Sequence, residues 1–223
     1  SHRPCPAVAL AGGFPPITPS REKAPPEAVA FPAVETPVQT IPIQKEPLMK
    51  TALLVIDTQQ SLLDMQPYRA EEMLAVIGQL LATARAHGRT VIYVRHGDEN
   101  DPQLKPGSPG WQIAARIAPQ PGERIIDKQY SSAFKGTDLL DYLHQNNIRR
   151  LIVVGMMTEY CIESTVRTAN YLDFDVVLPE GGNSTLANGK WSAQEVYEHH
   201  SGIMRGRFAA MPDVAEAAAM LSG

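Results

Sequence analysis

From Met49 onward, short runs of β-forming residues alternate with longer stretches in which apolar residues recur at helical spacing. Six runs are expected to form strands, at residues 52–56, 90–94, 124–126, 151–154, 176–178 and 207–209. Strands separated by helices are joined by right-handed crossovers, which make the sheet parallel and place helices on both of its faces. The sequence therefore predicts one doubly wound, Rossmann-like α/β domain over residues 49–223, built on a six-stranded parallel sheet.

The clearest helical pattern lies between the first two predicted strands and is stopped by Gly88. Its apolar residues follow one another at helical intervals: Met73, Leu74, Ile77, Leu80, Leu81 and Ala84. Further helices are expected to begin at four places, in chain order Thr137 or Asp138, Cys161, Ser192 and Asp213. With 43% apolar residues, the chain can bury one sizeable core.

Residues 1–48 have a different composition, since more than half of the 19 prolines precede Met49. Prolines at this density prevent a continuous helix or sheet. The segment is predicted to be an extended arm, either a native extension or an addition to a protein that naturally starts at Met49. Because an extended arm has no internal hydrogen bonds, we expect it to pack against the domain or a neighbouring subunit.

Charge and cysteine content limit the partners and the compartment. Twenty Lys and Arg residues against 24 Asp and Glu give a net charge of −4, without the basic cluster that nucleic-acid binding requires. No apolar run approaches the roughly 18 residues that span a bilayer, and residues 7–13 lack the basic front of a signal peptide. Cys5 and Cys161 are too few for a disulfide framework. We expect a cytoplasmic protein with no membrane or nucleic-acid partner.

Ligands of doubly wound sheets bind outside the carboxyl ends of the strands, so residues just after each predicted strand are candidate site residues. Asp57 follows the first strand, where a carboxylate at the end of a buried strand needs a partner, although capping a helix is an equally ordinary use of aspartate. Lys128 follows the third strand. Most lysines are solvated, but at this edge its ammonium could keep Asp57 ionised.

Cys161 follows the fourth predicted strand, in a turn led by Gly155 from which a helix opens near the cysteine. The helix dipole and free backbone N–H groups there are expected to stabilise a thiolate and to lower the pKa of Cys161. The same N–H groups could receive the negative oxygen of a tetrahedral intermediate. A buried structural cysteine is the alternative. Three complementary side chains at one sheet edge favour a nucleophilic Cys161.

Three segments, in this order and spacing, resemble the isochorismatase-like cysteine hydrolases: residues 53–59 (LLVIDTQ), 128–139 (KQYSSAFKGTDL) and 155–161 (GMMTEYC). The likeness extends over about residues 49–215. That family includes nicotinamidases, N-carbamoylsarcosine and ureidoacrylate amidohydrolases, and isochorismatase itself. The resemblance is specific for the superfamily and leaves the substrate open.

The resemblance implies a catalytic triad of Asp57, Lys128 and Cys161. Asp57 would accept the thiol proton, Lys128 would keep Asp57 ionised and favour the thiolate, and Cys161 would attack an amide carbonyl. Asp57 would then protonate the departing amine, releasing ammonia and leaving a thioester that water hydrolyses.

The resemblance also implies a cis peptide bond between Met156 and Met157. It would direct the backbone N–H groups of Met157 and Cys161 toward the oxyanion. Four further side chains are candidate substrate-binding residues by position, and ordinary packing is the alternative for each: Gln59, Phe134, Tyr160 and, less directly supported, Trp111.

No metal or other cofactor is expected. The metal-dependent nicotinamidases carry an Asp-x-His pair and a further His after the second strand, where this chain has residues 95–98 (RHGD). His96 and Asp98 could supply two metal ligands. His199 and His200 are a second pair, but neighbouring side chains on a helix point about 100° apart and chelate a metal poorly. No G-x-G-x-x-G occurs, and residues 182–190 do not match a phosphate-binding loop.

The leading interpretation is a metal-independent cysteine amidohydrolase that cleaves a C–N bond of a small amide or ureido substrate. One alternative is an isochorismatase-type vinyl ether hydrolase, in which the aspartate protonates the substrate and a cysteine is dispensable. Another is a non-catalytic, oligomeric member of the fold. The resemblance also implies a homo-oligomer, either a dimer or a tetramer.

Overall fold

The computed structural model describes residues 49–223; the predicted arm of residues 1–48 lies outside them. The strands in the described part are β1 (Thr51–Ile56), β2 (Thr90–His96), β3 (Arg124–Lys128), β4 (Arg150–Met156), β5 (Asp175–Val177) and β6 (Asn183–Ser184). The helices are α1 (Gln60–Asp64), α2 (Ala70–Ala86), α3 (Leu139–Gln145), α4 (Glu163–Tyr171), α5 (Ala193–Met204) and α6 (Val214–Ser222). Two short turns complete the list, the 3-10 turn η1 (Ala115–Ile117) and the π-helical turn η2 (Thr158–Ile162).

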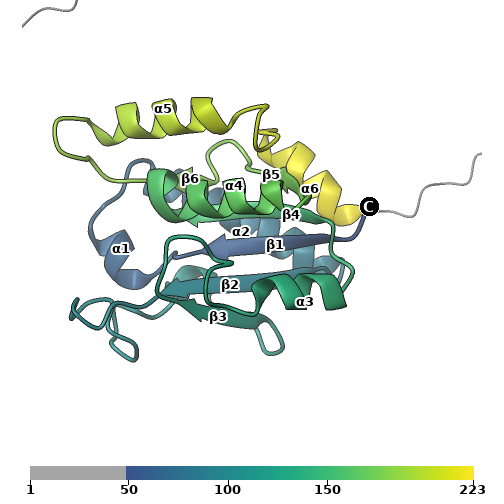
Figure 1. Cartoon of the computed structure of the whole chain (residues 1–223), viewed down its shortest axis with the longest axis horizontal. Helices are drawn as coiled ribbons and strands as arrows, with labels where there is room; N and C mark the ends of the chain where they lie inside the picture. Colours follow the sequence, from purple (N-terminus) through teal and green to yellow (C-terminus); the bar gives the residue numbers. More distant parts are fainter. Residues whose placement is uncertain (1–48) are drawn as a thin grey trace, which may run out of the picture. The chain divides into compact units, whose positions relative to one another are not determined.

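The strands form one parallel sheet in the order β3-β2-β1-β4-β5, and β6 pairs with the end of β4 (Figure 1). The chain runs from β1 outward to β3, then returns to the other side of β1 to form β4 and β5. β1 is therefore the central strand, and the return places the end of β4 beside the end of β1. The predicted doubly wound α/β fold with a six-stranded parallel sheet is confirmed.

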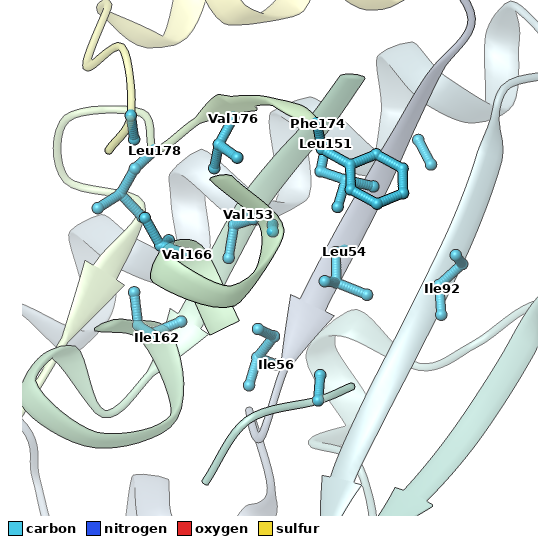
Figure 2. Close-up of a cluster of buried hydrophobic side chains, with 14 of the residues drawn as sticks. Leu54, Ile56, Ile92, Leu151, Val153, Ile162, Val166, Phe174, Val176 and Leu178 are labelled. Atoms are coloured by element: carbon cyan, nitrogen blue, oxygen red, sulfur yellow. The ribbon is translucent and has the colours of Figure 1, made fainter. Parts of the chain in front are cut away.

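Successive side chains of the central strands alternate between two hydrophobic cores. In β1, Leu54 and Ile56 belong to one core, while Leu53 and Val55 belong to the other. Figure 2 shows part of the first core, where side chains from β1, β2 and β4 meet those of α4 and β5. All four named side chains of β1 are at most 1% exposed, so truncating one to alanine is expected to cost about 2–5 kcal/mol.

Helices cover both faces of the sheet, as predicted. α3, α4 and the end of α5 contribute buried side chains to the first core, and α2 and α6 contribute to the second. In Figure 1, α3 and α4 lie in front of the sheet and α2 behind it. None of the helices in residues 49–223 combines the length and the apolarity needed to cross a membrane.

The predicted starts of three helices are confirmed by their caps. Asp138 precedes α3, the Ser192 hydroxyl accepts a hydrogen bond from the N–H of Glu195 at the start of α5, and Asp213 caps α6. The Ser192 and Asp213 side chains satisfy backbone donors that the first turn of a helix leaves free, whereas Asp138 makes no side-chain hydrogen bond to α3. The short helix α1 was not predicted, because its five residues are too few to show helical periodicity.

The prediction of a sixth strand at residues 207–209 is wrong. After α5 the chain turns at Gly206, whose φ is +70°, and only Ala210 pairs with β5, through a single bridge to Val177. The sixth strand is instead β6, Asn183–Ser184. Neither residue favours strands by propensity; they are extended because they pair with Gly155 and Met156 of β4.

Candidate active site

Asp57 lies one residue beyond the central strand β1 and is almost wholly buried, with 1% of its surface exposed. Its backbone N–H continues the sheet by donating to the Val94 carbonyl at 2.9 Å, but its φ of +46° turns the chain sharply away. That φ lies in the left-handed region, which few residues other than glycine adopt. The sheet thus ends at Asp57 and leaves its carboxylate at the strand edge.

Gly155 makes the close approach of β4 to β1 possible. It lies opposite Ile56 in the sheet, with a φ of +119°. A β-carbon at this position would lie 1.9 Å from the Ile56 carbonyl oxygen, far inside contact distance. Only glycine fits there, and the turn that carries Cys161 begins directly after it.

Lys128 reaches Asp57 from a strand that is not its neighbour. It ends β3, and β2 lies between β3 and β1, so the reach is about two strand spacings, or roughly 10 Å. The long lysine side chain spans this gap, and its Nζ lies 2.6 Å from Oδ2 of Asp57. The Lys128 side chain is 0% exposed, so the ammonium and the carboxylate form a buried ion pair.

Cys161 completes the cluster from the third direction. It lies in the π-helical turn η2, just after β4, and Nζ of Lys128 donates to its Sγ at 3.2 Å. Two contacts tie this turn to the segment around β6: Thr158 Oγ1 donates to Asn183 Oδ1 at 2.7 Å, and Thr185 Oγ1 donates to Glu159 Oε2 at 2.5 Å. The structure thus brings Asp57, Lys128 and Cys161 together at one edge of the sheet.

The surroundings of Cys161 determine its ionisation. Burial raises the pKa of its thiol to about 12; the negative charge of Asp57 adds to this effect and the ammonium of Lys128 opposes it. The sequence-based expectation of a lowered pKa is therefore wrong. It considered the dipole of the following helix, whereas loss of water and a nearby carboxylate dominate here.

The two carboxylate oxygens of Asp57 differ in their hydrogen bonding. Oδ1 is buried and accepts no hydrogen bond from any group in residues 49–223, while Oδ2 carries the contact with Lys128. A buried carboxylate oxygen without a donor is costly. Such an oxygen is a ready acceptor for a proton from a neighbouring group.

The peptide bond between Met156 and Met157 is cis, as the resemblance implied. The Met157 N–H donates to no backbone or side-chain acceptor within the part of the chain that the structure describes. It remains available to a ligand beside Cys161.

Gln59 and Trp111 lie at the border of the site, and the contacts that the structure shows for them are with other parts of the chain. Both amide hydrogens of Gln59 are used, to the His96 carbonyl at 3.0 Å and the Trp111 carbonyl at 2.9 Å, and its Oε1 accepts from the His96 N–H at 2.8 Å. Gln59 thus braces two loops. The Arg95 guanidinium lies over the Trp111 ring, with its central carbon 3.6 Å from the ring centroid. Direct substrate contact by either residue stays a prediction.

Phe134 and Tyr160 differ in burial: Phe134 packs against the protein interior and Tyr160 is exposed. Phe134 is partly buried against the first core and packs on Phe174, with ring centroids 6.1 Å apart. Tyr160 is 45% exposed, and its hydroxyl accepts a hydrogen bond from Asn188 Nδ2 at 2.9 Å. Packing explains Phe134, whereas the exposed Tyr160 ring is free to contact a ligand; a substrate-binding role stays a prediction for both.

A cavity of about 210 Å³ opens beside Lys128, with Trp111, Pro106 and Tyr130 among its other lining residues. A larger cavity of about 460 Å³ lies along α5, between Trp191 and His200, and none of the three clustered side chains lines it. The smaller cavity has Lys128 of the cluster in its lining, whereas Asp57 and Cys161 are not among its lining residues.

The part of the chain that matches a known family spans this whole cluster. Residues 51–211 match the model of the isochorismatase domain, and this range contains Asp57, Lys128 and Cys161. The chain belongs to the isochorismatase family.

Other isochorismatase-family proteins and hydrolases are similar to this chain. It is 33% identical over 137 residues to streptothricin hydrolase of Streptomyces noursei, covering 60% of this chain and 54% of that protein. It is 30% identical over 190 residues to the ureidoacrylate amidohydrolase RutB of Stutzerimonas stutzeri, covering 66% of this chain and 77% of RutB. The chain thus spans only about half the length of the streptothricin hydrolase.

Solved structures show the same fold. An isochorismatase from Pseudomonas putida has a TM-score of 0.71 at 29% identity, covering 76% of this chain and 90% of that one. An isochorismatase-family protein from Desulfovibrio vulgaris has a TM-score of 0.69 at 27% identity, covering 78% of this chain and 100% of that one.

His96 is a member of this isochorismatase-family site that the sequence interpretation considered only as a metal ligand. Its Nδ1 lies 3.3 Å from Nζ of Lys128. The signal was available, since His96 follows the predicted strand at residues 90–94 and ends β2 at the carboxyl edge of the sheet. Among residues 49–223, no three His, Cys, Asp or Glu side chains are grouped so as to hold a metal ion; metal independence of the reaction stays a prediction.

Proposed function

We propose that this isochorismatase-family domain is a cysteine hydrolase that cleaves a C–N bond of a small amide or ureido substrate, through a thioester and without a metal. One observation carries the proposal: a thiol and a carboxylate from two strand ends both contact the ammonium of Lys128, and a cavity opens beside Lys128. The name of RutB, an amidohydrolase, supports C–N cleavage over other hydrolytic reactions.

The first step transfers the thiol proton to Asp57 as sulfur attacks the carbonyl carbon. Because the pKa of Cys161 is raised to about 12, the thiol keeps its proton until a substrate arrives. Oδ1 of Asp57 has no other donor among the described residues and is the proposed acceptor. Lys128, bonded to both Sγ and Oδ2, stabilises negative charge on either atom while the proton moves.

The attack moves the carbonyl electrons onto oxygen, and the N–H groups of Met157 and Cys161 are the proposed donors to that oxyanion. Asp57 then gives the proton to the substrate nitrogen, the carbonyl re-forms and the C–N bond breaks. Ammonia departs, and the acyl group stays on the Cys161 sulfur as a thioester. Water gives a proton to Asp57 and attacks the thioester, the C–S bond breaks, and the thiolate recovers the proton.

The size of the cavity favours a small substrate. At about 210 Å³ it is smaller than the roughly 300–1,000 Å³ typical of pockets for drug-sized ligands. A short carboxamide or ureido compound fits this limit, and a large conjugate would have to extend into solvent.

Ammonia release from a panel of small amides and ureido compounds tests the proposal. We expect at least one compound to be hydrolysed by the wild-type protein, with turnover retained in EDTA and reduced at least about 10³-fold in Cys161→Ala. Undiminished turnover in Cys161→Ala would eliminate the thiol mechanism, and turnover of a vinyl ether by that variant would favour the isochorismatase-type reaction. An activity lost in EDTA and restored by a divalent metal would contradict metal independence.

A further inference from the structure

His96 and Lys128 are side by side because the sheet registers them as partners. β2 and β3 are parallel, and their last paired residues are His96 and Lys128. The preceding pair, Arg95 and Asp127, forms an ion pair at 2.7 Å. Since side chains alternate along a strand, that ion pair and the His96–Lys128 contact lie on opposite faces of the sheet.

The Lys128 ammonium has three N–H groups, and the site offers three acceptors for them. They are Asp57 Oδ2 at 2.6 Å, Cys161 Sγ at 3.2 Å and His96 Nδ1 at 3.3 Å. Because Nζ is buried, each N–H without an acceptor would be costly. His96 is the acceptor that accounts for the third hydrogen.

The backbone of His96 is fixed independently of its ring. Gln59 receives the His96 N–H through Oε1 and donates through Nε2 to the His96 carbonyl, at 2.8 and 3.0 Å. Gly97 then donates to the Lys128 carbonyl at 2.8 Å. The imidazole therefore projects from a braced strand end, and its position relative to Nζ is set by the sheet.

The charges around His96 favour its neutral form. Burial lowers the pKa of His96, and the positive charge of Lys128 lowers it further, while Asp57 and Asp98 oppose the shift. The other group facing it is the Cys161 thiol, bonded to the same ammonium. A neutral imidazole that accepts at Nδ1 carries its proton on Nε2.

We propose that His96 is a positioning residue of this site: it accepts the third N–H of the Lys128 ammonium and so holds the ammonium in the orientation that contacts both Asp57 and Cys161. Protonated His96 cannot accept this bond and places a second positive charge beside Lys128. Acid therefore releases the ammonium from its fixed orientation.

Substitution separates this role from simple packing, if the domain has the hydrolase activity proposed above. His96→Ala removes the acceptor, and we expect kcat to fall about ten- to a hundred-fold with little change in KM, the effect of losing one hydrogen bond to a buried charge. Asparagine places an amide oxygen near the position of Nδ1 and does not titrate. His96→Asn should recover most of the loss, to within about three-fold to five-fold of wild type.

The pH profile gives a readout that packing would not move. Because burial and the charge of Lys128 lower the pKa of His96 from its usual value near 6.5, wild type should lose kcat below that pH, and His96→Asn should lose this acid dependence. The exposed His87 provides the control, since His87→Ala should leave kcat and the profile unchanged. Equal kcat values in His96→Ala and wild type, or equal losses in His96→Ala and His96→Asn, would overturn the proposal.

NMR of the histidine ring nitrogens tests the contact without any substrate, so it remains informative if hydrolysis is not found. His96 is assigned by the signal missing from His96→Asn. We expect the Nε2–H tautomer at neutral pH and a midpoint below 6.5, which should rise in Lys128→Met, where the neighbouring cation is gone. An Nδ1–H tautomer in the wild-type protein would overturn the proposal, whereas an inactive protein with the expected tautomer would count against the hydrolase alone.

Discussion

At the scale of the residue, the proposed mechanism makes Cys161 a nucleophile that is not ionised in advance. With its pKa raised to about 12, its thiol is almost wholly protonated at neutral pH. Many reactive cysteines are instead ionised by a neighbouring cation or a helix N-terminus. In the proposed mechanism the base must act during the attack, so the carboxylate of Asp57 would take up the thiol proton while its charge suppresses the free thiolate.

Replacing Asp57 should therefore change two measurable rates in opposite directions, alkylation of Cys161 and hydrolysis of the amide. In Asp57→Asn the negative charge that raises the pKa of Cys161 is gone while Lys128 remains, so the pKa should fall. Alkylation of Cys161 by iodoacetamide at pH 8 should become faster than in wild type. Amide hydrolysis should drop by about 10²- to 10⁴-fold, because no group moves the proton. Peptide mapping separates Cys161 from Cys5; slower alkylation together with retained hydrolysis would contradict the assignment.

Residues after strands could be found from the sequence, and the bonds between them could not. Asp57, Lys128 and Cys161 stand out because each follows a β-rich run, and the fold collects such positions at one edge. The brace formed by Gln59 depends on backbone groups of His96 and Trp111, which no local pattern reveals. The direction of the pKa shift of Cys161 depends on burial, which the chain shows only once folded.

At the scale of the element, the β4 end and the η2 turn determine where the sulfur lies. Gly155 permits close contact with β1, and the hydrogen bonds from Thr158 and Thr185 hold η2 against the segment around β6. A strand end that could not approach β1 would move Cys161 away from Lys128. Stability and the placement of Cys161 beside Lys128 therefore depend on the same backbone contact.

Gly155→Ala tests this dependence. The added β-carbon would lie 1.9 Å from the Ile56 oxygen at a φ of +119°, so we expect the free energy of unfolding to fall by about 3 kcal/mol or more. Gly78 in α2 is a matched control because a β-carbon there has no atom within 4 Å; Gly78→Ala should raise stability by about 0.5–1 kcal/mol. Urea unfolding measures both. Equal stabilities of Gly155→Ala and wild type would show that the turn relaxes freely.

The elements themselves were predictable where hydrophobic patterns decide them. The long apolar period of α2 and the caps of α5 and α6 could be recognised in the sequence. β6 could not, because its two polar residues are extended only through pairing with β4. The strand misplaced at residues 207–209 shows the same limit: the chain turns there, and Ala210 alone bridges to β5, at Val177.

At the scale of the whole molecule, the sheet order explains why three residues distant in the sequence lie together. β1 lies between β2 and β4, so Asp57 is central, Cys161 arrives from the adjacent β4, and Lys128 reaches over the end of β2. Crossing β2 brings the ammonium past His96. The arrangement follows from the parallel topology, and a lysine is the side chain long enough to complete it.

The most direct test of the account is the partition of the acyl group when hydroxylamine competes with water, using any amide that the protein hydrolyses. A thioester on Cys161 should yield hydroxamic acid in proportion to the hydroxylamine concentration, alongside the carboxylic acid and ammonia, and the Cys161→Ala variant should yield none of the three. Formation of the carboxylic acid alone at every hydroxylamine concentration would contradict an acyl-enzyme, and with it the claim that thiol, carboxylate and ammonium work together in covalent catalysis.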